Sequence, residues 1–464
     1  MESSTNDEND GTRAPCESEA AYAAAERIPL REHADRGTKL HAMERRLVIS
    51  DVVDVRSMAM PPYEPARALP PGAGSVFGPD APIGSPAYAA ADARAITPAS
   101  VLPAAQPIPG WRARGSFGPD ERFEIRVPQG WNGRLVVAGT PAQRSEFACD
   151  LLFADPLLTR GYAYASGNKG VGDGGVLLTA GATFAIDGAT LPRFPLPGGA
   201  AMSLWQHAPG KTMERWVEEL LAVTHAAHDV IAHLHGTTPE RVYAVGLSNG
   251  GYTVRRAIES SDLFAGALTW NAVLWTPERN LLRQLPPAIA ALAAGTPEAL
   301  RALGFPPDVA GRSGGSLYQK NLAVYWYLTA WLHAAHLDPS TSQAYGDVAT
   351  PDAAEALLAG IGAWRLADHP RVADRIAGFA NTGAIRCKLL DLAAEYDHLV
   401  PPAEHFVPYG DLVQAAGCGD RYRAELLPNA QHVDAWSEDP DYPTMRPGWP
   451  RVMAAFDELV RWVG

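Results

Sequence analysis

Cysteine is scarce in this chain of 464 residues. The four cysteines, Cys16, Cys149, Cys387 and Cys418, form neither a disulfide framework nor a CxxC pair. Cys387 falls in an apolar stretch typical of a core strand, where a thiol behaves as a small hydrophobic side chain. The spacing therefore gives no reason to expect a disulfide-stapled fold.

Excess positive charge and long apolar runs are also missing. The net charge is −13, which does not favour binding to nucleic acid or to an anionic membrane. No run approaches the ~18 apolar residues of a membrane helix. The first ten residues are acidic and polar, unlike a signal peptide, and a start at Met43 would add no apolar segment. The sequence predicts a cytoplasmic protein, with export as the alternative if the start codon is wrongly assigned.

No metal-ligand pattern emerges from the 13 histidines. Within this set, His225, His228, His233 and His235 lie on or just past an amphipathic stretch from Met213 to Leu234. Only the pair His225 and His228 shares a helix face, and no cysteine or carboxylate set completes a tetrahedral site. We expect solvated or hydrogen-bonded helix histidines, and neither a metal nor a cofactor.

A G-x-S-x-G motif, Gly246 to Gly250, is the most informative segment that the chain does contain. The β-branched run Val242–Val245 precedes it, and a helical pattern from Tyr252 to Ser260 follows. A buried strand, a tight turn and a helix in this order are how α/β-hydrolases present a nucleophilic serine. The segment predicts Ser248 as the nucleophile, and the alternative is an ordinary serine in a surface turn.

A second match, Gly311 to Gly315, shows that the pattern needs structural context. The residues before Ser313, Phe305–Ala310, contain two adjacent prolines and cannot form an interior strand. We therefore expect Ser313 to be a turn residue without a catalytic role.

A serine hydroxyl needs a base and an acid that orients the base, and in this topology the acid precedes the histidine. An apolar stretch from Ile385 predicts a strand that ends before Asp397, which is followed by Val400-Pro-Pro. Asp397, just past the carboxyl end of this strand, is the predicted acid, and Glu395 is the second choice. Asp391 lies in mid-strand, where a charge would be buried without an evident reason.

The general base is predicted from chain order. The next strand, Arg421–Pro428, leads into a polar loop that contains His432. His398 and His405 come before that strand, too early for the expected topology. His432 is therefore the predicted base.

Two backbone N–H groups should bind the oxyanion of an acyl-transfer reaction. One is that of Asn249, after the nucleophile. The other is expected after the early strand Gly133–Gly139, where Thr140 is the first candidate and Pro141 has no N–H. Trp270 and Trp275, near the carboxyl end of the strand that follows the serine's helix, are predicted to contact substrate.

The order of elements predicts an α/β fold: an α/β-hydrolase fold with a mostly parallel, doubly wound sheet and an inserted helical lid. We expect residues 111–275 and 384–464 to form the catalytic domain and residues 276–383 to form the lid. Residues 1–42 are charged and poor in large apolar side chains, which predicts disorder. Residues 43–110 are rich in proline and alanine, and we expect extended chain over the catalytic domain or a linker.

Three further segments carry expectations about the fold. Phe123–Val127 alternates with period 2 and should open the sheet as an edge strand. Gly170–Pro209 is too long for a plain connection and should border the active site. Leu317–Leu337 is predicted to form one helix. Its aromatic residues either form the lid's own core or line a pocket, and the core is the favoured alternative for each individual residue.

On these residues the chain resembles α/β-hydrolases of the serine esterase type, over about 112–275 and 384–464. The long insertion before the acid is similar to the lidded tannase and feruloyl esterase group. Gly161–Gly170 resembles a stretch of hydroxybutyrate-oligomer hydrolases. Tannase-type enzymes usually carry a disulfide between cysteines beside the nucleophile and beside the histidine, whereas this chain has Leu247 and Gln431 there.

The resemblance implies hydrolysis of an aromatic or hydroxyacyl ester, small or oligomeric, through an acyl-enzyme. Three alternatives stay open at this point. The same triad serves amidases and peptidases, and it serves acyltransferases that use an alcohol acceptor. The chain would also fit a catalytically inactive α/β-hydrolase-like binding protein, although an intact order of Ser, Asp and His argues against it. Nothing in the sequence indicates an oligomeric state.

Overall fold

A computed structural model describes residues 26–27, 46–57, 73–75, 86–117, 121–142, 144–169, 175–179, 185–186, 189–190, 193–195, 201–205, 213–338 and 359–464. The segment 1–42, for which the sequence predicts disorder, lies outside these residues except for the short strand β1 (Glu26–Arg27).

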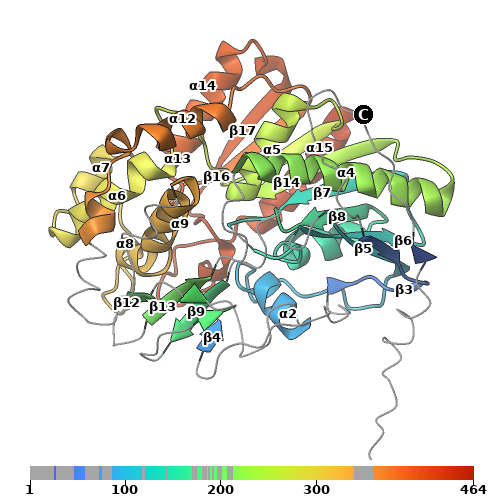
Figure 1. Cartoon of the computed structure of the whole chain (residues 1–464), viewed down its shortest axis with the longest axis horizontal. Helices are drawn as coiled ribbons and strands as arrows, with labels where there is room; N and C mark the ends of the chain where they lie inside the picture. Colours follow the sequence, from blue (N-terminus) through green and yellow to red (C-terminus); the bar gives the residue numbers. More distant parts are fainter. Residues whose placement is uncertain are drawn as a thin grey trace, which may run out of the picture.

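An eleven-stranded sheet forms the centre of the molecule (Figure 1). Its order is β1-β2-β5-β6-β8-β7-β14-β15-β16-β17, with β3 paired to β5. Neighbouring strands from β8 to β17 are parallel, and those from β1 to β8 are antiparallel. The other strands are β2 (Arg46–Ile49), β3 (Val53–Asp54), β5 (Pro109–Ser116), β6 (Arg122–Pro128), β7 (Arg134–Gly139), β8 (Ala163–Gly167), β14 (Arg241–Leu247), β15 (Gly266–Trp270), β16 (Lys388–Ala394) and β17 (Tyr422–Leu427).

Helices cover both faces of this sheet. Successive residues of a strand face opposite sides: on β14, Val242 and Ala244 enter one apolar core and Tyr243 and Val245 enter the other. The first core includes helices α4 (Met213–His235), α5 (Asn249–Ser260) and α14 (Val407–Ala415). The second includes η2 (Asp150–Ala154), α3 (Asp155–Leu158) and α15 (Trp449–Val463). This arrangement confirms the predicted α/β-hydrolase fold class.

The prediction that Phe123–Val127 is an edge strand is wrong. This stretch is β6, and it pairs with β5 on one side and β8 on the other. Strands from the N-terminal part of the chain, β2 and β3, then add beyond β5. The alternation in β6 reflects buried charged residues on one face rather than solvent, since Glu124 and Arg126 are fully buried.

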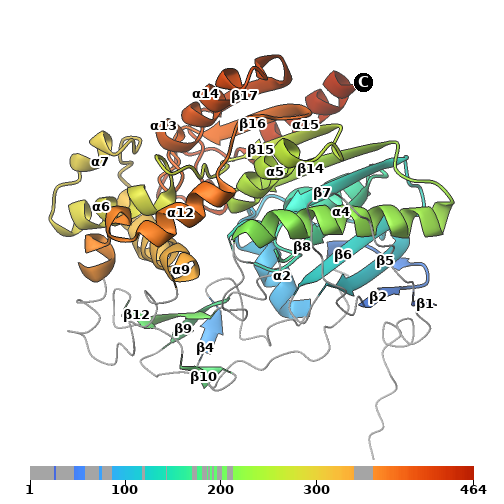
Figure 2. The ribbon, with the colours of Figure 1, turned by 45° about the horizontal axis from the view of Figure 1, so that its top comes forward.

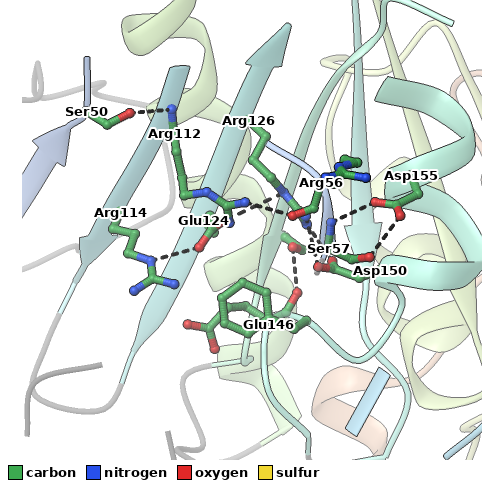
Figure 3. Close-up of polar contacts among 12 residues, drawn as sticks. Ser50, Arg56, Ser57, Arg112, Arg114, Glu124, Arg126, Glu146, Asp150 and Asp155 are labelled. Atoms are coloured by element: carbon green, nitrogen blue, oxygen red, sulfur yellow. Dashed lines mark hydrogen bonds and ion pairs between the residues drawn. The ribbon is translucent and has the colours of Figure 1, made fainter. Parts of the chain in front are cut away.

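Buried hydrogen bonds join the N-terminal segment to this sheet beside a group of buried ion pairs (Figure 3). Arg112 pairs with Glu124, and Arg126 donates to both carboxylate oxygens of Asp150. Ser57 donates to Asp155 through its backbone N–H, at 2.8 Å, and through its hydroxyl, at 2.9 Å. The described part of residues 43–110, which includes α2 (Pro86–Arg94), therefore contacts the segment between β7 and β8.

The segment 276–383 is helical in its described part and lies at one end of the sheet (Figures 1 and 2). It contains α6 (Leu281–Ala293), α7 (Ala299–Ala302), α8 (Leu317–Asn321), η4 (Leu322–Trp326), α9 (Tyr327–Leu337), η5 (Leu366–Asp368) and α12 (Pro370–Phe379). The expected helix Leu317–Leu337 is present, with a π-helical turn, η4, in its middle.

Short strands occupy part of Gly170–Pro209. β9 (Gly175–Thr179), β12 (Arg193–Pro195) and β13 (Ala201–Trp205) form a separate antiparallel sheet with β4 (Ala73–Ser75). β10 (Ala185–Ile186) pairs with β11 (Ala189–Thr190). The rest of this stretch lies outside the described residues. The remaining short helices are α13 (Pro402–His405), η6 (Gly419–Arg421) and η7 (Asp434–Trp436).

Candidate active site

Ser248 occupies a strained turn between β14 and α5. Its backbone has φ 59° and ψ −124°, a conformation that is costly for a residue with a side chain. A Cβ at Gly246 would collide with the carbonyl of Gly250, and a Cβ at Gly250 would collide with the carbonyl of Gly139. The glycines of the motif are therefore required by close backbone packing, and the turn has the shape of a nucleophile elbow.

Backbone hydrogen bonds fix this turn to the chain that follows β15. The N–H of Ser248 donates to the carbonyl of Trp270 at 3.0 Å, and the N–H of Val273 donates to the carbonyl of Ser248 at 3.2 Å. The strain is thus held by neighbouring strands at the carboxyl edge of the sheet, where ligands of α/β sheets commonly bind.

Asp397 lies in the turn after β16. Its Oδ1 accepts hydrogen bonds from the N–H groups of Leu399, at 2.9 Å, and Val400, at 2.7 Å. The carboxylate is fully buried, and its Oδ2 faces His432. Two backbone donors on one oxygen fix the carboxylate so that the other oxygen is presented to the imidazole.

His432 connects the acid to the serine. Its Nδ1–H donates to Oδ2 of Asp397 at 2.7 Å, and Ser248 Oγ donates to Nε2 at 3.0 Å. Ser248 is 7% exposed, His432 is 5% exposed and Asp397 is 0% exposed. The predicted nucleophile, acid and base therefore lie in one buried hydrogen-bonded row. The second choice of acid, Glu395, instead accepts the N–H of Asn429 at 2.9 Å.

Asn271 is a residue of this site that the sequence did not reveal. It has φ 49° and follows β15 directly. Its Nδ2 donates to the carbonyls of His432, at 2.8 Å, and Gln431, at 3.2 Å, and its Oδ1 accepts the N–H of Ala394 at 2.7 Å. Asn271 thereby ties the histidine loop to the end of the strand that precedes Asp397.

The buried charge of Asp391 is paired with Arg255, a partner that could not be predicted from the sequence. Its carboxylate accepts from Arg255 of α5 at 2.6 Å, from Thr269 at 2.6 Å and from the hydroxyl of Tyr422 at 2.8 Å. Arg255 and Asp391 are both fully buried. The pair ties α5, the helix that follows Ser248, to the strand that leads to Asp397.

His398 and His405, which lie between the acid and the base in the sequence, make hydrogen bonds that support the fold. His405 Nδ1 accepts the N–H of Leu274 at 3.1 Å, and its Nε2 donates to Gln284 at 2.9 Å. Burial lowers the pKa of His405 to about 3. His398 Nε2 donates to the carbonyl of Pro307 at 2.9 Å, and burial lowers its pKa as well. Both imidazoles are therefore neutral at neutral pH.

The loop after β7 lies against the serine turn. Thr140, the predicted second oxyanion donor, is fully buried, and its hydroxyl donates to the carbonyl of Gly167 at 3.2 Å. A Cβ at Gly250 would also meet the carbonyl of Thr140. The first predicted donor, the N–H of Asn249, belongs to the first residue of α5. The structure therefore brings both donor residues next to the same turn.

The two predicted substrate contacts have different surroundings. Trp275 is buried among residues of the helical segment, with its ring 5.2 Å from that of His333 and 5.8 Å from that of Phe379. His333 of α9 in turn lies beside Asn249, with 3.4 Å between His333 Nε2 and Asn249 Nδ2. Trp270 is instead fully buried in the apolar core that includes α15, with its ring against Gly448.

Ser313, in the second G-x-S-x-G match, lies in a loop that docks on the chain after His432. Its N–H and hydroxyl donate to the carboxylate of Asp441, at 2.6 and 2.9 Å. These exposed hydrogen bonds agree with the expected turn role.

Within the described part of the chain, no cluster of three or more His, Cys, Asp or Glu side chains has the arrangement of a metal site. Over the same residues, no helix has the length and apolar character needed to cross a bilayer.

Comparisons with known proteins find likenesses in structure alone. No protein-family model and no curated protein matches the chain. Feruloyl esterase B from Aspergillus oryzae is 12% identical, with 90% of this chain and 87% of that chain covered and a TM-score of 0.43. A Pyrococcus horikoshii acylaminoacyl peptidase is 11% identical, with 74% and 39% covered and a TM-score of 0.35. This chain thus spans about two fifths of that peptidase.

A third structure is that of BpoC from Mycobacterium tuberculosis, described as a putative non-heme bromoperoxidase. It is 13% identical, with 74% of this chain and 97% of that chain covered and a TM-score of 0.36. The likenesses are too distant to carry a substrate or an activity over to this chain.

Proposed function

We propose that this chain is a serine hydrolase that cleaves carboxylic esters through an acyl-enzyme. The observation that carries the proposal is the buried row from Ser248 through His432 to Asp397, formed by residues far apart in the sequence. A serine hydroxyl becomes a nucleophile when a neutral imidazole can accept its proton and a carboxylate orients that imidazole. The strained turn that presents Ser248 supports the same role.

In the proposed reaction, Ser248 Oγ attacks the ester carbonyl while His432 Nε2 takes the proton. Asp397 holds the tautomer with the proton on Nδ1 and stabilises the imidazolium that forms. The N–H groups of Asn249 and Thr140 would bind the oxyanion of the tetrahedral intermediate. His432 then protonates the leaving alcohol, and water attacks the acyl-enzyme with His432 again as the base. These steps require no metal ion or cofactor.

We further propose an acyl group that is aromatic or carries a hydroxyl, with the helical segment 276–383 acting as a lid. His333 and Trp275 support this because the His333 ring lies beside Asn249 and the Trp275 ring packs against that of His333. Most aromatic residues of the long helix serve the segment's own packing. Trp326, for example, is fully buried and donates its Nε1–H to the carbonyl of His398.

The test is hydrolysis of p-nitrophenyl esters, from acetate to octanoate together with a hydroxybenzoate, by the wild type and by Ser248→Ala. We expect hydrolysis by the wild type and none above background by the variant. Equal rates for the two proteins would remove Ser248 from the mechanism.

Three alternatives are distinguished when a matched amide and an alcohol acceptor are added to these measurements. An amidase or peptidase would cleave a matched amide as well as the ester, whereas an esterase would leave the amide intact. An acyltransferase would prefer an added alcohol over water as acceptor. An inactive binding protein would show neither reaction, and it would fail to react with a fluorophosphonate that labels nucleophilic serines.

A further inference from the structure

A buried lysine, Lys169, lies two residues past the end of β8 and beside the loop that follows β7. Its Nζ donates to the carbonyl of Ala142 at 2.5 Å and lies 4.6 Å from the ring centre of Trp216. Lys169 is 2% exposed, and the charge of the buried Glu219 acts on it. Burial of an ammonium group costs solvation free energy, and this cost outweighs the attraction of Glu219, so that burial lowers the pKa of Lys169 to about 7. The attraction of Glu219 therefore does not by itself account for a lysine at this position.

The contact of Lys169 falls on the strained part of the loop. Ala142 has φ 44°, which an L-residue rarely adopts, and it is exposed. Pro141, just before it, lacks an N–H. Ala142 is therefore a point at which the loop would relax if its carbonyl lost its hydrogen-bond donor.

Both ends of this loop are fixed by other contacts. At its start, the Thr140 hydroxyl donates to the carbonyl of Gly167. Past Ala142, Arg144 donates to Asp92 of α2 at 2.7 Å, and the Ser145 hydroxyl donates to the same carboxylate at 2.6 Å. The Lys169 hydrogen bond lies between these anchors, so its loss should alter the loop locally without unfolding it.

A row of rings leads from Lys169 to the residue after the nucleophile. The Trp216 ring lies 6.4 Å from that of His333, and His333 lies beside the side chain of Asn249. Contacts through Trp216 and His333 thus connect Lys169, beside the loop of Thr140, to Asn249 at the start of α5.

We propose that Lys169 is a positioning residue of the oxyanion hole. It holds residues 140–142 in the conformation that presents a backbone N–H to the oxyanion, and it does so through the Ala142 carbonyl, away from the reacting atoms. The proposal rests on the function proposed above, because it assigns a positioning residue to the oxyanion hole of that same site.

The experiment compares the wild type with Lys169→Met, Lys169→Arg and Lys388→Met. Lys388 is the matched control because its Nζ also donates to a backbone carbonyl at 2.5 Å, that of Trp462, and lies 5.4 Å from the Trp462 ring. Lys388 stands at the first residue of β16, at the end of the strand opposite to Asp397. The measurements are kcat and KM for a p-nitrophenyl ester, the rate of labelling by a fluorophosphonate, and inhibition by a trifluoromethyl ketone.

We expect Lys169→Met to lower kcat and the labelling rate by roughly ten- to a hundredfold, with KM within about threefold, since displaced oxyanion donors weaken the transition state more than the ground state. The ketone, whose tetrahedral adduct places an oxyanion in the hole, should bind more weakly by a similar factor. Lys169→Arg should restore most of the loss because a guanidinium can donate to the same carbonyl. Lys388→Met should match the wild type in kcat.

Labelling separates failure of this proposal from failure of the proposed function. Wild-type labelling that Ser248→Ala abolishes, with an unchanged rate in Lys169→Met, would overturn the role of Lys169 alone. No labelling of the wild type would overturn both proposals. A loss in Lys169→Met that arginine does not restore, and that tracks a lower melting temperature and a higher KM, would mark a merely structural lysine.

Discussion

At the scale of single residues, Asn271 should control the reactivity of the site without touching the reacting atoms. Asn271→Asp replaces a donor to the carbonyls of Gln431 and His432 with a carboxylate that repels them. Unsatisfied buried carbonyls cost about 1–3 kcal/mol each, and the histidine loop should shift to relieve them. We expect kcat for an ester to fall by roughly ten- to a hundredfold, measured beside the melting temperature.

Asn429→Asp is the control for this variant. Asn429 has a similar left-handed backbone, φ 56°, and lies in the same loop, but its side chain is exposed. The control should keep kcat within about twofold of the wild type. An Asn271→Asp protein with wild-type kcat would show that His432 is held by other contacts.

The predictability of single residues followed their pattern in the sequence. Ser248 lies in a motif whose glycines are sterically required, and chain order together with the predicted strand ends then selected Asp397 and His432. His432 does lie within hydrogen-bond distance of both Asp397 and Ser248. Asn271 belongs to no motif, and its left-handed backbone is invisible in the sequence. Lys169 could be noticed only once its partner carbonyl, 27 residues earlier in the chain, was seen beside it.

At the scale of elements, the buried pair Arg255–Asp391 should determine how firmly α5 is attached to β16. Arg255→Met leaves a buried carboxylate without its cation, which typically costs 3–5 kcal/mol. We expect about that loss in the free energy of unfolding, measured by urea denaturation. The double variant Arg255→Met/Asp391→Leu should recover much of it, because no charge is then left unpaired.

Asp262→Asn supplies the comparison for an exposed ion pair. Asp262 is 79% exposed in its pair with Arg386, and such pairs contribute about 0–1 kcal/mol. If the double variant were no more stable than Arg255→Met alone, the interaction would depend on the hydrogen bonds of Thr269 and Tyr422 to Asp391 rather than on charge balance.

Strands and helices with a clear hydrophobic periodicity were predictable from the sequence, whereas features that depend on tertiary contacts were not. The apolar run before Ser248 and the amphipathic stretch after Met213 became β14 and α4 at nearly the expected positions. β6 was expected at an edge, but β5 and β8 pair with its two sides and β2 adds beyond β5. Its buried arginine–carboxylate pairs also give the same alternation of apolar and charged residues as an exposed strand. The π-helical turn in the long helix likewise has no signal in its composition.

At the scale of the whole molecule, response to acid should be set by buried groups with opposite effects. Burial lowers the pKa values of His333, to about 4, and of His336 and His405, to about 3. Burial raises the pKa of Glu219 to about 8. As the pH falls, the histidines make unfolding take up protons, whereas Glu219 binds its proton already in the folded state. The stability of the wild type therefore contains both of these opposite contributions.

The variant His405→Gln isolates the contribution of one histidine to the pH dependence of stability. The ordinary pKa of histidine is 6.5, and burial lowers the pKa of folded His405 to about 3. Between these two pH values His405 is protonated in the unfolded chain and neutral in the folded protein. Its contribution to the free energy of unfolding therefore decreases as the pH falls through that interval. His405→Gln can still accept from Leu274 and donate to Gln284, but it cannot be protonated. Relative to the wild type, it should gain about 1.4 kcal/mol per pH unit between pH 6 and pH 4. Urea denaturation at each pH measures this difference, which should stay constant from pH 7.5 to pH 9, where His405 is neutral in both states. A difference that is flat across the acid range would mean that His405 can be protonated in the folded protein, and the packing around Leu274 and Gln284 would then have to open to water.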